Sequence, residues 1–298
     1  CNNKTTAVVC TDFNNQRDID FFVVNYGAPA QLFSNQRDGS FKEVAEQVGI
    51  KGVEKSFGVA VGDFNKDGFT DFYVSGSEKF YLSDGRGAFR MGGQPFRYAD
   101  LGINNIESLD YDNDGLLDLV AVTDRGAHML RGLGSTLDDV GAFTGNLKLA
   151  NTRALASGEV FGSGAADIIS ISADGTLTVL KNEGARKNYV RVALEGKTSN
   201  KSAIGTKAEI RSGSLTQKLE VYASSPAPAA AGLTFGLGYR TKVDALKLTW
   251  PAGIVQSELS VNAAKLNEFP ELDRKGTSCP ILYAWNGSEY AFVTDFLG

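Results

Sequence analysis

Short apolar segments separated by polar turns make up the first two thirds of the chain. Typical segments are residues 21–24, 72–74 and 119–122, each three or four residues long. Apolar runs of this length, bounded by glycine, asparagine or aspartate, predict β-strands. Only residues 43–48 show a brief helical pattern, and no helical period separates successive strands. The pattern therefore predicts an all-β fold built from many short strands.

A nine-residue polar loop recurs between strands at a regular interval. Residues 63–71 read DFNKDGFTD, and residues 110–118 read DYDNDGLLD. Weaker copies start at residue 12, with Arg17 in place of the glycine, and at residue 159, with Phe161 at the third position. The four copies start about 50 residues apart, and units of about four short strands at this period are typical of propeller blades.

These units, which span residues 7–184, resemble the FG-GAP/VCBS repeat family. The resemblance rests on the two intact loops, the apolar strands beside them and the repeat interval. An EF-hand is a poorer match, because no helix flanks the loops and the twelfth positions hold Val74 and Ala121 instead of glutamate. The resemblance implies an integrin-type β-propeller. Such propellers commonly have seven blades, so we expect residues 1–184 to form part of a larger propeller, with a closed ring of four as the alternative.

A different pattern begins near residue 185. Residues 188–194 alternate polar and apolar side chains, as a half-buried strand does. Further motifs follow at residues 199–207, 217–221, 235–238 and 243–253. In this order they resemble the ASPIC/UnbV domain, which follows such repeats in the cartilage acidic protein family.

The resemblance implies a small β-sandwich-like domain over residues 185–272. Within it, the alanine- and proline-rich residues 224–232 are expected to form a loop. Residues 273–298 are expected to form a β-hairpin with a turn at Asn286 and Gly287, and to begin a further domain.

The recurring loop has the spacing of a cation site. Oxygen-bearing side chains stand at its first, third, fifth and ninth positions, and a glycine at the sixth permits the left-handed turn that their convergence needs. Four carboxylates this close repel one another unless a cation or protons are present. We expect calcium, which accepts six to eight oxygens in irregular geometry. The alternative is a turn held by side-chain hydrogen bonds without a metal.

Two loops are strong candidates for calcium and one is weaker. The candidate ligands in the third unit are Asp110, Asp112, Asp114 and Asp118, with the carbonyl of Leu116. Those in the second unit are Asp63, Asn65, Asp67 and Asp71, with the carbonyl of Phe69. Those of the weaker first unit are Asp12, Asn14, Gln16 and Asp20, with the carbonyl of Asp18. The first unit has fewer charges and no glycine at the sixth position, and the fourth is expected to bind no ion.

Charge and cysteine content limit the partners and the cellular location that the sequence allows. The 298 residues carry a net charge of −5 with no basic stripe, which argues against a nucleic-acid partner. No apolar run approaches the ~20 residues that cross a bilayer. Three cysteines, Cys1, Cys10 and Cys279, give no disulfide framework. Cys1 fits either the lipid-carrying residue of a bacterial lipoprotein or merely the point where the sequence begins.

Signals for catalysis are weak. The only histidine, His128, alternates like a strand residue, and no Ser/His/Asp set, Cys/His cluster or phosphate loop is present. Paired carboxylates for sugar hydrolysis remain open among the many acids. Trp250 and Trp285 could stack against a sugar ring. As strand residues they could instead belong to the core of a domain or to its rim.

We therefore expect a non-catalytic, calcium-binding scaffold outside the cell or at its surface. It would serve adhesion or bind an extracellular protein or glycan through loops on a rigid frame. Two alternatives stay open. One is a carbohydrate-active enzyme, such as a calcium-dependent lyase or hydrolase, or its binding module. The other is a subunit of an extracellular filament that self-assembles through exposed strand edges.

Overall fold

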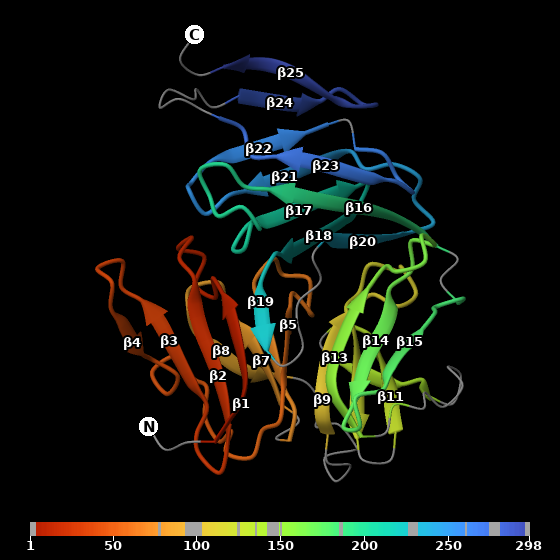
Figure 1. The fold of residues 1–298 in the computed structure, drawn as a ribbon. Coiled ribbons are helices and arrows are strands. Elements are labelled where there is room, and N and C mark those ends of the chain that lie inside the picture. Colours follow the sequence, from red (N-terminus) through yellow and green to blue (C-terminus); the bar gives the residue numbers. More distant parts are fainter. Residues whose placement is uncertain are drawn as a thin grey trace.

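The structure is a computed structural model. It describes residues 4–76, 79–92, 103–123, 126–134, 136–141, 149, 151–184, 187–225, 232–259, 261–273 and 281–295. The fold is all-β, as predicted, and arranged in several small sheets (Figure 1). Within the described residues, no helix is both long and apolar enough to span a bilayer.

Four antiparallel sheets form the first part of the molecule. The first holds β1 (Lys4–Thr11), β2 (Asp20–Tyr26), β3 (Gln31–Asn35) and β4 (Phe41–Glu43). The second holds β5 (Val59–Gly62), β6 (Asp71–Val74), β7 (Lys79–Ser83) and β8 (Phe89–Gly92). The third holds β9 (Ile103–Leu109), β10 (Asp118–Thr123), β11 (Gly126–Gly132) and β12 (Leu137–Asp139). The fourth holds β13 (Thr152–Gly158), β14 (Asp167–Ser172) and β15 (Leu177–Leu180).

Neighbouring sheets meet through their first strands and share apolar cores. Strand β1 contacts β5, β5 contacts β9, and β9 contacts β13, so the sheets follow one another in an arc (Figure 1). Phe72 on β6 packs toward the first sheet, whereas the next residue, Tyr73, packs toward the third. The same alternation holds for Leu119 and Val120 on β10. Both faces of these strands are buried, which explains their continuous apolar sequence.

Three local expectations were wrong or incomplete. Residue 43 ends β4 and residues 45–49 form turns, so the brief helical pattern marks the edge of a blade and not a helix. Strands β12 and β13 were not predicted, because Leu137–Asp139 and Thr152–Gly158 are polar or small and lack an apolar run. The fourth unit shows three strands among its described residues.

The second part of the chain forms two packed sheets. One has the order β20 (Leu233–Gly238), β16 (Asn188–Glu195), β23 (Leu266–Pro270). The other has the order β18 (Leu215–Glu220), β17 (Lys207–Ser212), β21 (Ala245–Thr249), β22 (Val255–Glu258). Both sheets contribute to one core, in which Trp250 is fully buried and donates to Gln256. This is a β-sandwich-like domain, called the second domain below.

One strand of the second domain leaves it and joins the first sheet. Strand β19 (Ala223–Ser225) pairs antiparallel with β1, with Ser224 opposite Val9. The expected loop over residues 224–232 was therefore wrong at its start, where Ser224 and Ser225 are strand residues. Residues 226–231 lie outside the described part.

The last described segment is the predicted hairpin, β24 (Ile281–Trp285) and β25 (Tyr290–Asp295). Trp285 is half-exposed there, and the Lys242 ammonium lies 5.6 Å from its ring centroid. Cys1 and Cys279 lie outside the described residues, so the proposal of a lipidated Cys1 stays a prediction.

Candidate calcium loops

The four recurrent loops connect the first strand of each sheet to its second. They are the first loop (residues 12–20), the second loop (63–71), the third loop (110–118) and the fourth loop (159–167). The ninth residue of each is the first residue of the second strand and is buried. This position belongs to Asp20, Asp71, Asp118 and Asp167. All four loops lie at the end of their sheets that faces the second domain (Figure 1), as the contacts below show.

The ninth-position carboxylate joins three segments of its blade. Asp71 accepts hydrogen bonds from the N–H groups of Phe64 (3.1 Å) and Ser83 (2.8 Å). Asp118 accepts the equivalent bonds from Tyr111 (2.9 Å) and Gly132 (2.7 Å). Each of these aspartates therefore ties the loop to the end of the third strand.

The first-position carboxylate is held by the loop's own backbone. Asp63 accepts from the N–H groups of Asp67 (3.0 Å) and Gly68 (2.9 Å). In the third loop, Asp110 accepts from Asp114 (3.0 Å) and Gly115 (2.8 Å) in the same way. A carboxylate oxygen has two lone pairs, so each oxygen keeps one for a cation.

The backbone of the four copies follows one path. Positions four and six have positive φ in every loop, in the left-handed region that favours glycine. The fourth-position residues are Asn15, Lys66, Asn113 and Gly162, and the sixth-position residues are Arg17, Gly68, Gly115 and Gly164. Arg17 has a φ of 72°, so the first loop keeps its shape at a cost in backbone strain. The backbone conformation of the loops is therefore the same whether or not all the oxygen ligands are present.

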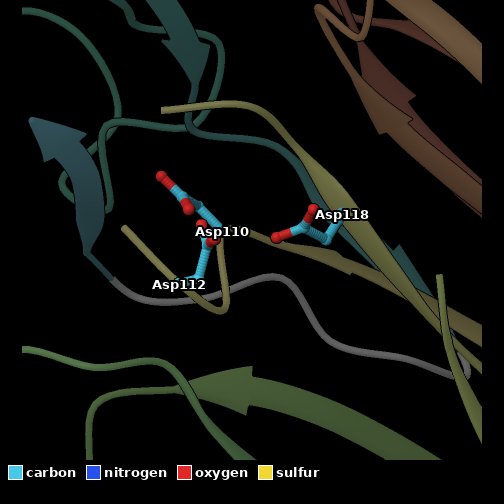
Figure 2. Close-up of side chains that lie close together, drawn as sticks. All are labelled: Asp110, Asp112 and Asp118. Atoms are coloured by element: carbon cyan, nitrogen blue, oxygen red, sulfur yellow. The ribbon is translucent and has the colours of Figure 1, made fainter. Parts of the chain in front are cut away.

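The third loop brings three carboxylates together. Figure 2 shows Asp110, Asp112 and Asp118, whose oxygens lie within 4.8 Å of one another. Burial raises the pKa of Asp110 to about 7 and that of Asp118 to about 8. The fourth predicted ligand, Asp114, is paired with Arg131 at 2.8 Å. Asp112 pairs with Lys187 at 2.8 Å and lies 3.3 Å from Arg131, so the charge of Asp110 and Asp118 is the charge that protons or a further cation must offset. The oxygens of the group suit calcium.

The second loop has the same backbone hydrogen bonds and fewer counter-charges, but its three aspartates do not converge within 4.8 Å as those of the third loop do. Burial raises the pKa of Asp63 to about 6 and that of Asp71 to about 7. Among the described residues, no lysine or arginine forms a salt bridge with Asp63, Asp67 or Asp71. The Asn65 Oδ1 atom accepts from the Asp67 N–H at 3.0 Å, as Asp112 does for Asp114. The residues of this loop therefore fit calcium.

The first loop already contains a cation from the protein. The Lys207 ammonium on β17 donates to Asp12 Oδ2 (2.6 Å), to the Asp12 carbonyl (3.0 Å) and to Asn15 Oδ1 (2.6 Å). Asp18 is paired with Arg37, and Asn14 accepts from the Gln16 N–H. The weaker third calcium site predicted here fits an internal ammonium better than a metal ion.

The fourth loop also meets a cation of the second domain. Its first residue, Glu159, forms an ion pair with Arg191 of β16. Its ninth residue, Asp167, accepts from the Val160 N–H at 2.8 Å and the Asn182 N–H at 2.8 Å. Phe161 at the third position offers no oxygen ligand.

Each loop thus meets a basic side chain from residues 187–218. Lys187 pairs with Asp112 at 2.8 Å, and Lys218 donates to the Gly68 carbonyl at 2.6 Å, beside the contacts of Lys207 and Arg191. Sequence reasoning missed these residues, because nothing in their local pattern distinguishes them from exposed strand lysines. The only feature of the sequence that points to these basic residues is the excess negative charge of the loops that they contact.

Two residues that the sequence offered as functional candidates, His128 and Trp250, make contacts within the fold. His128 Nδ1 lies 3.1 Å from Asp139 Oδ2 on the adjacent strand. Trp250 is enclosed in the core of the second domain and cannot serve as a sugar platform.

The blades carry polar loops at one end, and a β-sandwich-like domain lies on those loops. Residues 12–74 match the family model described as FG-GAP-like repeat, and residues 196–275 match the model described as ASPIC and UnbV. The chain therefore carries both modules that its sequence predicted.

The curated relatives share one name. Cartilage acidic protein 1 of Mus musculus is 25% identical over 289 residues, which cover 85% of this chain and 42% of that protein. The protein of the same name from Xenopus tropicalis is 32% identical over 108 residues, covering 34% of this chain and 16% of that protein. The chain spans less than half the length of these relatives.

A solved structure was also found. An Agrocybe aegerita lectin described as specifically recognising non-reducing terminal N-acetylglucosamine aligns at 20% identity and a TM-score of 0.38. The alignment covers 59% of this chain and 52% of the lectin. A likeness at this TM-score carries no argument about fold or ligand.

Proposed function

We propose that this chain is part of a calcium-binding, non-catalytic scaffold that acts outside the cell or at its surface. Its role would be adhesion or the binding of an extracellular protein or glycan. The convergence of Asp110, Asp112 and Asp118 in the third loop carries the proposal, because backbone hydrogen bonds orient Asp110 and Asp118 without a metal ion. The family matches and the name of the relatives support the extracellular setting.

Calcium in this scaffold would be structural. The third loop joins β9 to β10, and its Asn113 carbonyl accepts from the Gly238 N–H of the second domain at 2.8 Å. A cation at Asp110, Asp112 and Asp118 would therefore stabilise both the blade and the domain contact. Extracellular calcium modules have dissociation constants on the order of 10⁻⁴–10⁻³ M, so such sites would fill outside the cell.

Calcium removal tests the metal proposal. Chelator is expected to lower the melting temperature of the parent chain, and Asp112→Ala and Asp67→Ala should each reduce that response. Asp138→Ala, an exposed aspartate outside the loops, is the matched control and should respond like the parent. An unchanged melting temperature in excess chelator would contradict the proposal.

A second experiment tests what the scaffold binds and whether it catalyses a reaction. A glycan array combined with a turnover screen on acidic polysaccharides separates a binding module from a lyase or hydrolase. Saturable binding without product supports the scaffold, whereas product formation would replace it with a carbohydrate-active enzyme. Imaging of the native material would reveal the filament of the remaining alternative.

A further inference from the structure

A cavity of about 460 Å³ lies between the blades and the second domain. Its lower wall comes from the first strands of three blades, β5, β9 and β13. The second domain closes it through β16, β18 and β20. The volume is within the range of about 300–1,000 Å³ found for small-molecule sites.

The walls of the cavity are mainly apolar. Apolar side chains of both modules line it, and they are Val61, Leu109, Leu117, Val160, Val192 and Leu233. Among the polar lining residues, acids outnumber bases. Glu159 is compensated by its ion pair with Arg191, and the Lys218 ammonium is engaged by the Gly68 carbonyl. The charge that is not paired inside the cavity is therefore negative.

Glu107 on β9 is the buried carboxyl of the cavity that lacks a basic partner among the described residues. Its side chain lines the cavity, and the residue is only 4% exposed. It accepts a hydrogen bond from the Ser157 hydroxyl at 3.1 Å. Within the described part of the chain, no lysine, arginine or histidine forms a salt bridge with it. Burial without a cationic partner raises the pKa of Glu107 to about 8.

A buried carboxyl without a cation keeps its proton, and its ionised form is stabilised when a ligand supplies the missing positive charge. Tyr222, which lies beside Glu107 and bonds to Ser108, encloses the same region with an aromatic ring. A ligand that suits this surrounding has one cationic group for Glu107 and an apolar body for the walls. An anionic ligand is disfavoured, because it would face Glu107 and Glu220.

We propose that this cavity binds a small organic amine, with its ammonium on Glu107 and its apolar body between the blades and the second domain. The cavity borders the calcium loops, since Asp63 and Asp110 also line it. Glu107 itself lies on β9, outside those loops, and the proposal does not depend on the proposed scaffold function. It would make the contact between the two modules sensitive to a small molecule.

The test uses the full chain, saturated with calcium, and two isosteric probes. We expect 2-phenylethylamine to bind saturably by calorimetry, at least about tenfold more tightly than 2-phenylethanol, because a charge-assisted hydrogen bond distinguishes them. Glu107→Gln keeps the shape of the side chain and removes its charge. It is expected to lose that tenfold preference while keeping the melting temperature of a folded protein.

A second variant tests the location. Gly158 lines the cavity on β13, and a Cβ added there meets no atom within 4 Å. Gly158→Leu is therefore expected to fill the cavity and abolish binding of both probes, whereas Gly158→Ala should retain it. Equal affinity for amine and alcohol, undiminished amine binding by Glu107→Gln, or no saturable binding near about 1 mM would overturn the proposal.

Discussion

At the scale of single residues, the loop aspartates combine two roles that oppose each other. Asp71 and Asp118 accept backbone N–H groups from two segments, and both are buried between them. Burial in turn raises the pKa of Asp71 to about 7 and that of Asp118 to about 8. The charged forms are therefore disfavoured in the metal-free fold, and a calcium ion would remove this penalty.

Stability without calcium is expected to fall as the pH rises. The ordinary pKa of aspartate is 3.8, so between this value and 7 to 8 the folded chain holds protons that the unfolded chain has lost. Each such group then contributes a slope of at most about 1.4 kcal/mol per pH unit to the free energy of unfolding. Melting temperatures in chelator from pH 5 to pH 8 measure this fall.

Two comparisons isolate the loops from other buried acids. Asp71→Asn should flatten the slope, and added calcium should remove most of it, because the bound ion replaces the protons. Glu107 and Asp20 also have raised pKa values and leave a residual slope. Identical pH profiles with and without calcium would show that the loop carboxylates are not the source.

At the scale of elements, strand β19 links the two modules. Strand β1 uses one edge for β2 and the other for β19, with Val8, Val9 and Cys10 facing β19. An unpaired inner edge would expose backbone N–H and C=O groups to other chains. Three residues of the second domain therefore complete the first blade.

Proline in β19 should weaken this link. Ser224→Pro constrains the strand and removes a backbone N–H, with an expected cost of about 1–3 kcal/mol in the free energy of unfolding. Faster amide hydrogen exchange at residues 8–10 is the specific readout. Ser224→Ala keeps the backbone and is the control. Unchanged exchange in the proline variant would mean that β19 does not protect β1.

At the scale of the whole molecule, the second domain covers the loop end of the blades through charged and close-packed contacts. Lys207 and Asp12 are both almost fully buried, and they join β17 to the first loop. Strand β20 approaches the third loop so closely that a Cβ on Gly236 would lie 2.1 Å from Asp110 Oδ2. The two modules are therefore expected to unfold together.

The buried ion pair should be strongly coupled to stability. Lys207→Met leaves Asp12 buried without its cationic partner, at an expected cost of about 3–5 kcal/mol, and adding Asp12→Asn should recover part of it. Lys247→Met, which breaks an exposed pair with Glu209, is the control and should cost at most about 1 kcal/mol. Denaturant unfolding measures all three variants. Equal effects of the two lysine substitutions would contradict the buried contact.

The glycine contact should connect domain packing with calcium. Gly236→Ala is expected to displace β20 or the third loop, since the new Cβ would also lie 2.6 Å from Asn113 Cα. We expect a lower melting temperature and at least about tenfold weaker calcium binding, because Asp110 must move. Gly232→Ala, whose Cβ would only meet Val192 O at 3.6 Å, should behave like the parent.

Local pattern determined much of this protein. Strand runs, the repeat interval and the left-handed sixth position of the loops follow from side chains close in sequence, so the blades and the aspartates of the second and third loops could be predicted. The positive φ at the fourth position was not predicted. Strands β12 and β13 could not, because their pairing depends on neighbouring strands and not on apolar runs. The shape of the first loop was predictable, but its Lys207 was not, since that contact joins residues 195 positions apart.

The sequence by itself therefore determined the repeat, the loop conformation and the order of the modules, because backbone sterics and strand patterning act over a few residues. Only the tertiary structure decided which charges meet. It placed a base of the second domain on each loop, inserted β19 beside β1 and left Glu107 in a cavity without a basic partner among the described residues. Such contacts depend on how two folded sheets pack against each other. They join residues far apart in the sequence, so no periodic pattern in the chain predicts them.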